Sequence, residues 1–180
     1  MTTLVLAALL PSLASAQEVR PPTNAVSVQP LAFASDGIAA QYERFLKERW
    51  SLAVGPAVRF GAGGDYSSLH LGAGGELRYW ILGHAPFDDW TGRAMVGPFV
   101  SVRLDLAWVT LSNDVQDRTV GSFFTFAESA WLGYRVSAWK RLEISLLVGY
   151  AMRHEIDPSG RLAPYRRGAI GVGGTLGWMF

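Results

Sequence analysis

The sequence contains no cysteine, which excludes disulfide scaffolds and thiolate zinc sites. It also lacks an excess of charge of either sign, because 16 Lys and Arg stand against 15 Asp and Glu, for a formal net charge of +1. Such a chain has no sustained positive field to hold a phosphate backbone, so we expect no nucleic-acid partner. Lysine itself is rare, with only Lys47 and Lys140.

Long apolar runs are also missing. The stretch Leu4 to Leu10 has seven apolar residues, whereas a membrane-spanning helix needs about 18 to 20. Ala14-Ser15-Ala16 follows it, so the segment matches the apolar region and cleavage site of a secretory signal peptide, although the Met-Thr-Thr start carries no basic residue. We therefore expect a signal peptide over residues 1–16 and a short periplasmic lead-in over 17–23, where Pro21 and Pro22 cannot join a strand ladder.

Glycine and aromatic residues, in contrast, are abundant. The chain has 20 Gly together with 7 Trp, 6 Tyr and 9 Phe, a mixture typical of closely packed strands rather than helices. A length of 180 residues is ample for one domain. The composition therefore predicts a single all-β domain over residues 24–180.

Alternation with a period of two runs through this domain. From Trp50 to Phe60 every even position is apolar, and the odd positions carry small or charged residues. Similar alternation occurs over 69–79, 96–108, 124–134, 142–152 and 170–180, with weaker segments at 24–33 and 36–46. The connections are too short for crossover helices, which predicts eight antiparallel strands in up-and-down order.

Two details of this pattern concern strand register and connections. Glu128 falls on the apolar side and Trp131 on the other side, which predicts a bulge or a change of register there. We expect outer connections at about 61–67, 110–121 and 156–167. The connection at 81–92 is long for a periplasmic turn.

The character of the two faces decides the class of barrel. A soluble barrel has an apolar interior and a charged exterior, and an outer-membrane barrel has the reverse. The polar face here is mostly Gly, Ala and Ser with isolated charges, as in a narrow lumen. The ten steps from Trp50 to Phe60, tilted by ~45°, give roughly 23 Å of height, close to the ~25 Å apolar band of membrane barrels. We therefore predict an eight-stranded transmembrane β-barrel.

The signal peptide, the eight strands, the Gln41-Tyr42-Glu43-Arg44 segment and the alternating C-terminal residues together resemble small bacterial outer-membrane β-barrel proteins of the outer-membrane protein A barrel type. The resemblance implies location in a Gram-negative outer membrane after cleavage near Ala16, with outer-membrane lipid and lipopolysaccharide as surroundings. It also implies that the barrel-assembly machinery recognises the chain end. The residues of this assembly signal are Val172, Leu176, Trp178 and Phe180.

Inward positions of the predicted strands carry five acids and five arginines, with Gln41 and His70 beside them. They are Glu43, Arg59, Glu76, Arg78, Arg103, Asp105, Arg135, Glu143, Arg153 and Glu155. An eight-stranded barrel has room inside only for side chains, so these charges must largely pair with one another. We expect a plugged monomeric barrel with a structural or surface-interaction role; a selective pore along the same residues is the alternative.

Residues typical of catalysis or cofactor binding are sparse. The three histidines, His70, His84 and His154, lie on separate segments, and the glycine-rich stretches have no helix after them to receive a phosphate. We expect no catalytic residue, cofactor or metal. One alternative is a lipid A-modifying outer-membrane enzyme, for which Ser68-x-His70 and His154-Glu155 are the best candidates for a serine, histidine and carboxylate site. A soluble periplasmic ligand carrier of the lipocalin type is another.

The predicted outer connections contain two weaker candidates for binding. Asn113, Asp114 and Asp117 carry oxygen ligands that could hold Ca²⁺, but the glycine and distal glutamate of an EF-hand are absent. Arg161, Arg166 and Arg167 could meet lipopolysaccharide phosphates. Solvated loop side chains are the simpler interpretation of both sets.

Overall fold

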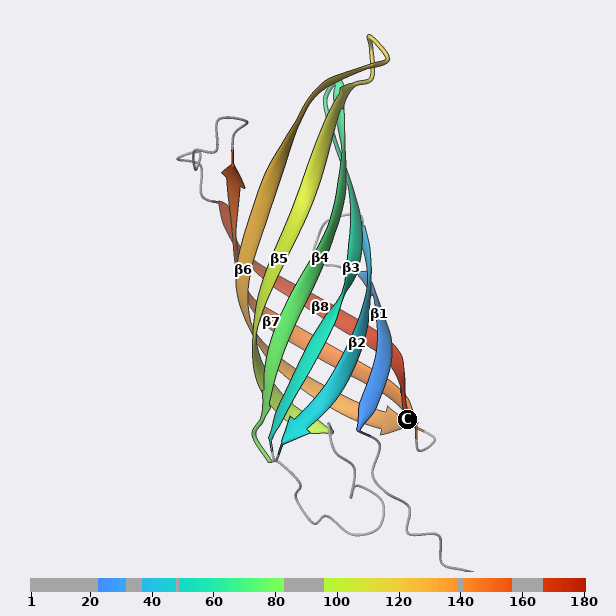
Figure 1. Ribbon diagram of the computed structural model, residues 1–180, viewed down its shortest axis with the longest axis vertical. Coiled ribbons are helices and arrows are strands. Elements are labelled where there is room, and N and C mark those ends of the chain that lie inside the picture. Colours follow the sequence, from blue (N-terminus) through green and yellow to red (C-terminus); the bar gives the residue numbers. More distant parts are fainter. Residues whose placement is uncertain (1–22, 32–36, 48, 83–95, 139–140, 157–166) are drawn as a thin grey trace, which may run out of the picture.

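The computed structural model describes residues 23–31, 37–47, 49–82, 96–138, 141–156 and 167–180. Eight strands form one closed barrel in which each strand pairs antiparallel with its neighbours in the chain and β1 pairs with β8 (Figure 1). The predicted all-β, eight-stranded up-and-down barrel is confirmed. Its strands are β1 (Asn24–Leu31), β2 (Gly37–Lys47), β3 (Trp50–Gly63), β4 (Tyr66–Trp80), β5 (Gly97–Asn113), β6 (Arg118–Ala138), β7 (Leu142–Ile156) and β8 (Arg167–Met179).

The predicted signal peptide, residues 1–16, lies outside the described residues, as does the predicted lead-in of 17–23 except for Thr23. Among those that are described, no helix has the length and apolar character needed to cross a membrane.

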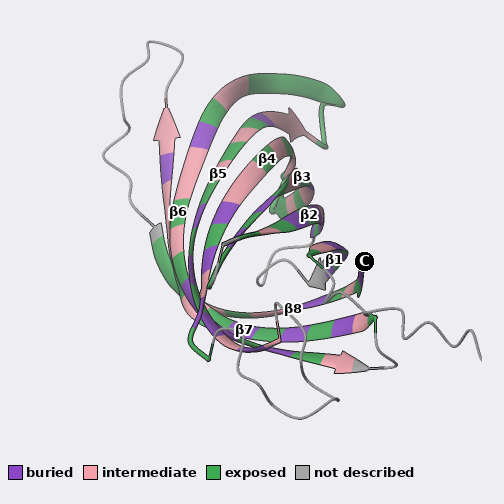
Figure 2. Ribbon diagram, turned by 60° about the horizontal axis from the view of Figure 1, so that its bottom comes forward, coloured by how far each residue is buried: buried purple, intermediate pink, exposed green. Residues whose placement is uncertain are grey.

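The alternation of the sequence becomes an alternation of burial. In β3, Ser51 and Ala53 are buried inside the barrel, whereas Leu52 and Val54 are exposed on its outer face. Figure 2 shows the same banding along most strands, because successive side chains point to opposite faces of a sheet. The apolar face is therefore the outer one, and the small and charged residues line the lumen.

The strands extend further than their apolar patterns. The connection expected at 61–67 is only a turn at Gly64 and Asp65, where Gly64 has φ +60°. The connection expected at 110–121 is likewise wrong, since β5 continues to Asn113 and β6 begins at Arg118. Of the connections expected at 81–92 and 156–167, residues 83–92 and 157–166 lie outside the described residues, and Ile156 and Arg167 belong to strands.

The bulge predicted at Glu128 and Trp131 is also wrong. The pairing of β6 with β5 and with β7 is continuous through both residues, and the irregularity lies between Leu111 and Ser112 of β5. Trp131 points into the lumen, where the absence of a side chain at Gly149 leaves room for its ring. Glu128 remains on the outer face.

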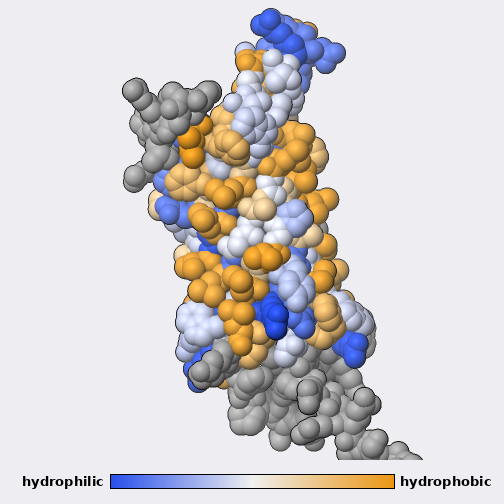
Figure 3. All heavy atoms as spheres, in the orientation of Figure 1, coloured by the Kyte–Doolittle hydropathy of each residue, from blue (hydrophilic) through white to orange (hydrophobic). Residues whose placement is uncertain are grey.

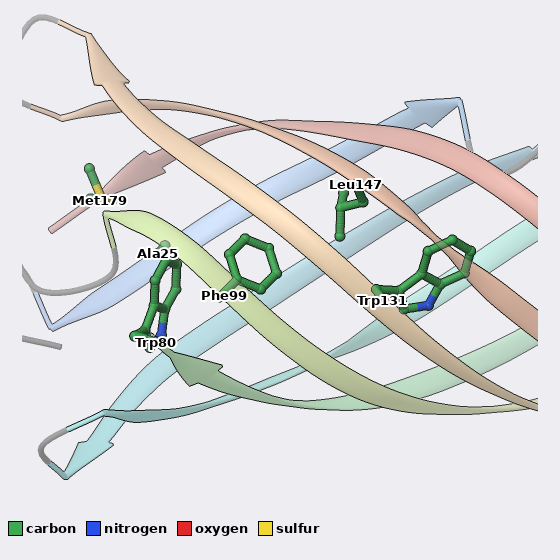
Figure 4. Close-up of a cluster of buried hydrophobic side chains, with 6 residues drawn as sticks. All are labelled: Ala25, Trp80, Phe99, Trp131, Leu147 and Met179. Carbon is green, nitrogen blue, oxygen red and sulfur yellow. The ribbon is translucent and has the colours of Figure 1, made fainter. Parts of the chain in front are cut away.

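A cluster of apolar side chains lies in the lumen near the end where both described termini lie. Figure 4 shows this cluster, formed by Ala25, Trp80, Phe99, Trp131, Leu147 and Met179. The rings of Trp80 and Phe99 lie 4.8 Å apart at 47°. A Cβ at Gly133 would collide with the Phe99 ring, so this glycine makes space for the cluster.

Candidate functional site

A layer of charged side chains crosses the lumen beside the apolar cluster. At its centre Arg78 donates from Nη1 to Glu43 Oε2 (2.6 Å), from Nε to Glu76 Oε1 (2.7 Å) and from Nη2 to Gln41 Oε1 (3.0 Å). All four residues are buried. The planar guanidinium, which stays protonated in a dry site, is suited to joining two carboxylates in this way.

Glu43 connects this arginine to a second one. Its Oε2 also accepts a hydrogen bond from Arg135 Nη2 (2.7 Å), and its Oε1 accepts one from Ser51 Oγ (2.5 Å). Arg135 Nε lies 2.8 Å from Glu143 Oε2, but its N–H donates to Ser145 Oγ at 3.0 Å. The Arg135–Glu143 contact is therefore an ion pair rather than a hydrogen bond.

The charged layer and the apolar cluster also contact each other directly. The guanidinium carbon of Arg78 lies 5.2 Å from the centre of the Phe99 ring, and that of Arg135 lies 5.0 Å from the Trp80 ring. These distances are in the range of cation–π attraction, which is strongest where water is excluded. The two layers therefore lie against each other in the lumen, with the aromatic rings against the arginines.

A second ionic group lies further from the termini. Arg103 donates to Asp105 from Nε (2.9 Å) and Nη2 (2.7 Å), and from Nη1 to Gln29 Oε1 (2.9 Å). Arg59 lies 3.8 Å from the same aspartate. Next to it is a hollow of about 20 Å³, whose lining includes His70 and residues of β3, β5, β6 and β7. This is room for about one ordered water.

The structure therefore brings eight of the ten predicted lumen residues into two groups. The first holds Glu43, Glu76, Glu143, Arg78 and Arg135, and the second holds Arg59, Arg103 and Asp105.

The other two, Arg153 and Glu155, lie on the inward face of β7, but in the described part of the chain no ion pair joins them to these groups. The charges balance overall but not locally. Three carboxylates face two arginines in the first group. Adding Arg153 and Glu155 to the second gives three arginines against two carboxylates.

The neutral partners were missed by the sequence reasoning. Gln29, Ser51 and Ser145 each hydrogen-bond a lumen charge. Each of these residues is at an inward position, so the alternation of side chains along its strand could have indicated it.

Of the residues considered for catalysis, Ser68 and His70 are in contact, but His154 lies on the opposite face of the barrel wall. Ser68 Oγ and His70 Nε2 are 3.1 Å apart at lumen positions of β4, whereas His154 belongs to the outward-facing set of β7. His154 and Glu155 point to opposite faces as neighbours in a strand. Among the described residues there is no group of three or more His, Cys, Asp or Glu that could hold a metal ion. His84 lies outside the described residues.

The residues considered for Ca²⁺ form a hydrogen-bonded turn. Asn113 Oδ1 accepts from the backbone N–H groups of Val115 (3.1 Å) and Gln116 (2.9 Å), and Asp114 Oδ1 accepts from Ser67 Oγ (2.5 Å). These contacts give the side chains a structural role at the turn. Arg161 and Arg166 lie outside the described residues, and Arg167 is the first residue of β8.

The C-terminal residues predicted as an assembly signal share one face of β8. Val172, Leu176, Trp178 and Phe180 are all exposed on the outside of the barrel. The backbone of Phe180 closes the barrel, since its N–H donates to the carbonyl of Asn24 (2.8 Å) and its carbonyl accepts from Asn24 N–H (3.0 Å).

Comparisons with known proteins agree with this architecture. No protein-family model matches the sequence, and curated proteins give no significant match. Among solved structures, the N-terminal β-barrel domain of OprF from Pseudomonas aeruginosa is 13% identical with a TM-score of 0.50, over 87% of this chain and 95% of that chain. Neisserial surface protein A is 12% identical with a TM-score of 0.43, over 86% and 92%. The likeness to the OprF domain shows that this chain has the fold of a small eight-stranded β-barrel.

Proposed function

We propose that this protein is an outer-membrane β-barrel of a Gram-negative envelope, with a structural or surface-interaction role and no catalytic activity. The outward apolar belt carries the proposal. Val54, Leu104 and Leu146 are 47%, 51% and 71% exposed on the outside of the barrel, and Figure 3 shows hydrophobic residues over much of its visible flank. A belt of this kind in water would favour association or aggregation, whereas in a bilayer it faces acyl chains.

Aromatic side chains at both ends of the belt support the same placement. Trp50 and Tyr79 pack with ring centres 4.9 Å apart toward the end with the termini, and Trp108 and Phe124 pack at 4.5 Å toward the other end. Such rings favour the two membrane–water interfaces. The closed ladder leaves no sheet edge within the barrel, which is the condition for a strand protein to cross hydrocarbon.

The filled lumen supports a structural role rather than transport. The aromatic cluster and the Arg78–Arg135 layer occupy the end near the termini, and the space beside Arg59 has room for about one water. We therefore expect little conduction. Planar-bilayer recording of the purified protein tests this, and steady porin-sized openings would show that the lumen is a pore.

Lipopolysaccharide and the barrel-assembly machinery are the partners that we propose for a monomer in this membrane. The first would surround the outer part of the belt. The second would recognise the outward side chains of β8, including Trp178 and Phe180, each about half exposed.

Expression of the full chain in a Gram-negative host tests the location. We expect a heat-modifiable band on electrophoresis and recovery from the detergent-solubilised outer membrane. Recovery of folded protein from the aqueous periplasmic fraction would overturn the proposal and favour a soluble carrier, although the apolar outer face argues against one.

A further inference from the structure

An ionisable pair lies on the outer face of the barrel. Glu128 has a side chain that is 51% exposed, and its Oε1 is 3.1 Å from Nε2 of His154 on the neighbouring strand. The His154 ring stacks on Phe126, with ring centres 4.4 Å apart and an angle of 13° between the planes. The pair is therefore held in place by a hydrogen bond and by an aromatic contact.

The surroundings of Glu128 make this position unusual. Its partners on the two adjacent strands are Leu104 and Met152, both apolar. A carboxylate on the lipid face of a barrel is destabilising toward the middle of the bilayer and is tolerated near an interface. Phe126 and Phe124 are the next two outward side chains toward the far end, so Glu128 lies at the inner border of the aromatic residues there.

A trough begins at this carboxylate and runs along the outer face toward the termini. Its first hollow, of about 540 Å³, has Glu128 in its lining, together with apolar side chains that include Leu77, Val102 and Tyr150. A second hollow of about 560 Å³ shares Leu77 and Val102 with the first and continues to Trp50. The trough therefore runs from Glu128 to Trp50, at the aromatic end of the belt nearer the termini.

Small residues make the trough possible. Gly75 lines the first hollow and Ala130 lines both, on strands that otherwise carry larger outward side chains. A Cβ built at Gly75 would meet no atom within 4 Å, so the space above it is open. The lack of large side chains at these two positions leaves a depression in the outer surface.

We propose that the trough binds one acyl chain of an amphiphile in the leaflet opposite the termini, and that Glu128 and His154 accept or share hydrogen bonds with its polar group. The inference rests on the proposed function, because only in a bilayer are acyl chains the medium around this face. An ionised carboxylate can only accept hydrogen bonds, so its complement is a donor such as an ammonium, hydroxyl or amide group. The occupant is thus an amphiphile with a donor at the base of its headgroup.

Photolabelling in vesicles tests this proposal. The protein is reconstituted in phosphatidylcholine vesicles with a trace of octadecylamine that carries a mid-chain diazirine, and in parallel with the methyl ester of the matching diazirine stearate, which has no donor. Labelled peptides are mapped by mass spectrometry. We expect the amine to label the trough, at residues such as Val102 and Ala130, severalfold more than the outer face of β8, and the ester to label both faces about equally.

Two variants and a matched control sharpen the result. Glu128→Gln should remove the amine's preference while leaving the trough open to both probes, and Gly75→Leu should reduce labelling of the trough by either probe. Val28→Phe adds apolar bulk on the outer face of β1, a strand that lines neither hollow, and should leave the preference unchanged.

Equal labelling of both faces by both probes would overturn the inference, as would crosslinked dimers joined through the trough, since a second copy would then be its occupant. Failure of the wild-type protein to insert, seen as extraction by carbonate and no heat-modifiable band, would instead overturn the proposed membrane location.

Discussion

Replacing Arg78 by methionine removes a charge from the centre of the lumen while keeping an unbranched side chain that occupies the inner part of the same space. The arginine is fully buried, and it binds Glu43, Glu76 and Gln41. After the substitution Glu43 still has Arg135 as a partner, whereas Glu76 loses both of its hydrogen bonds from Arg78. The main consequence is therefore a buried carboxylate without its counter-charge.

The expected loss of stability follows from this orphaned group. Removing one partner of a buried ion pair costs about 3 to 5 kcal/mol. Since about 1.4 kcal/mol is a factor of ten, the ratio of folded to unfolded protein should fall by roughly 100-fold to a few thousand-fold. Urea unfolding of the barrel in phospholipid vesicles, followed by tryptophan fluorescence and by gel mobility without boiling, measures the change.

A control and a double variant separate burial from charge. Arg59→Met removes an arginine that is partly exposed and 3.8 Å from its carboxylate, so its effect should stay at or below about 1 kcal/mol. Adding Glu76→Gln to Arg78→Met should recover about 1 to 3 kcal/mol, because the orphaned charge is then absent. If Arg78→Met proved no more destabilising than Arg59→Met, the lumen charges would be hydrated and the plug would be refuted.

Three further outcomes can be checked by the same methods. Val54→Arg places a charge in the outer belt and should destabilise the barrel in vesicles by about 2–4 kcal/mol; a neutral effect would place this face in water. Phe180→Ala should lower the folded fraction recovered from the outer membrane without changing unfolding of the purified barrel, and an unchanged yield would exclude a role in assembly. Gly133→Val should destabilise by about 1–3 kcal/mol because its side chain overlaps the Phe99 ring, whereas Gly75→Val, in open space, serves as its neutral control.

The sequence predicted the faces of the strands well, because period-two alternation is fixed by strand geometry. It failed where the chain leaves the apolar belt. Beyond Trp108 the side chains of β5 become polar, as at Thr110 and Ser112, so the pattern looks like a loop although the backbone ladder continues. Alternation of apolar residues appears only where one face of a strand contacts an apolar environment. The backbone hydrogen bonds that define the strand continue where both faces are polar.

The partners of the lumen charges were beyond prediction for a different reason. The alternation along β6 places Arg135 inside the barrel. Its contact with Glu43, however, joins two strands that are distant in the chain, and it depends on the register of all the strands around the barrel. Trp131 shows the same limit. Alternation along β6 places its side chain inward, but the space for its ring lies at Gly149 of the next strand, which no pattern within β6 indicates.

At the end of the barrel away from the termini, beyond the apolar belt, some described stretches of strand pair with only one neighbouring strand. Within the described chain, the paired residues of β6 at 118–123, all but Val120 at the register shift, pair with β5 alone, and residues 60–63 of β3 pair with β4 alone. The turns at the tip are joined by a hydrogen bond from Asp114 N–H to the Asp65 carbonyl (2.8 Å). The outer backbone amides of β6 at 118–123 should therefore exchange with solvent deuterium in the folded protein, while those of 124–135, on the stretch paired with both neighbouring strands, stay protected. Among the described residues, one strand thus passes at Phe124 from two-sided to one-sided pairing, and the tip can vary in sequence and in local stability without disturbing the ring of hydrogen bonds below it.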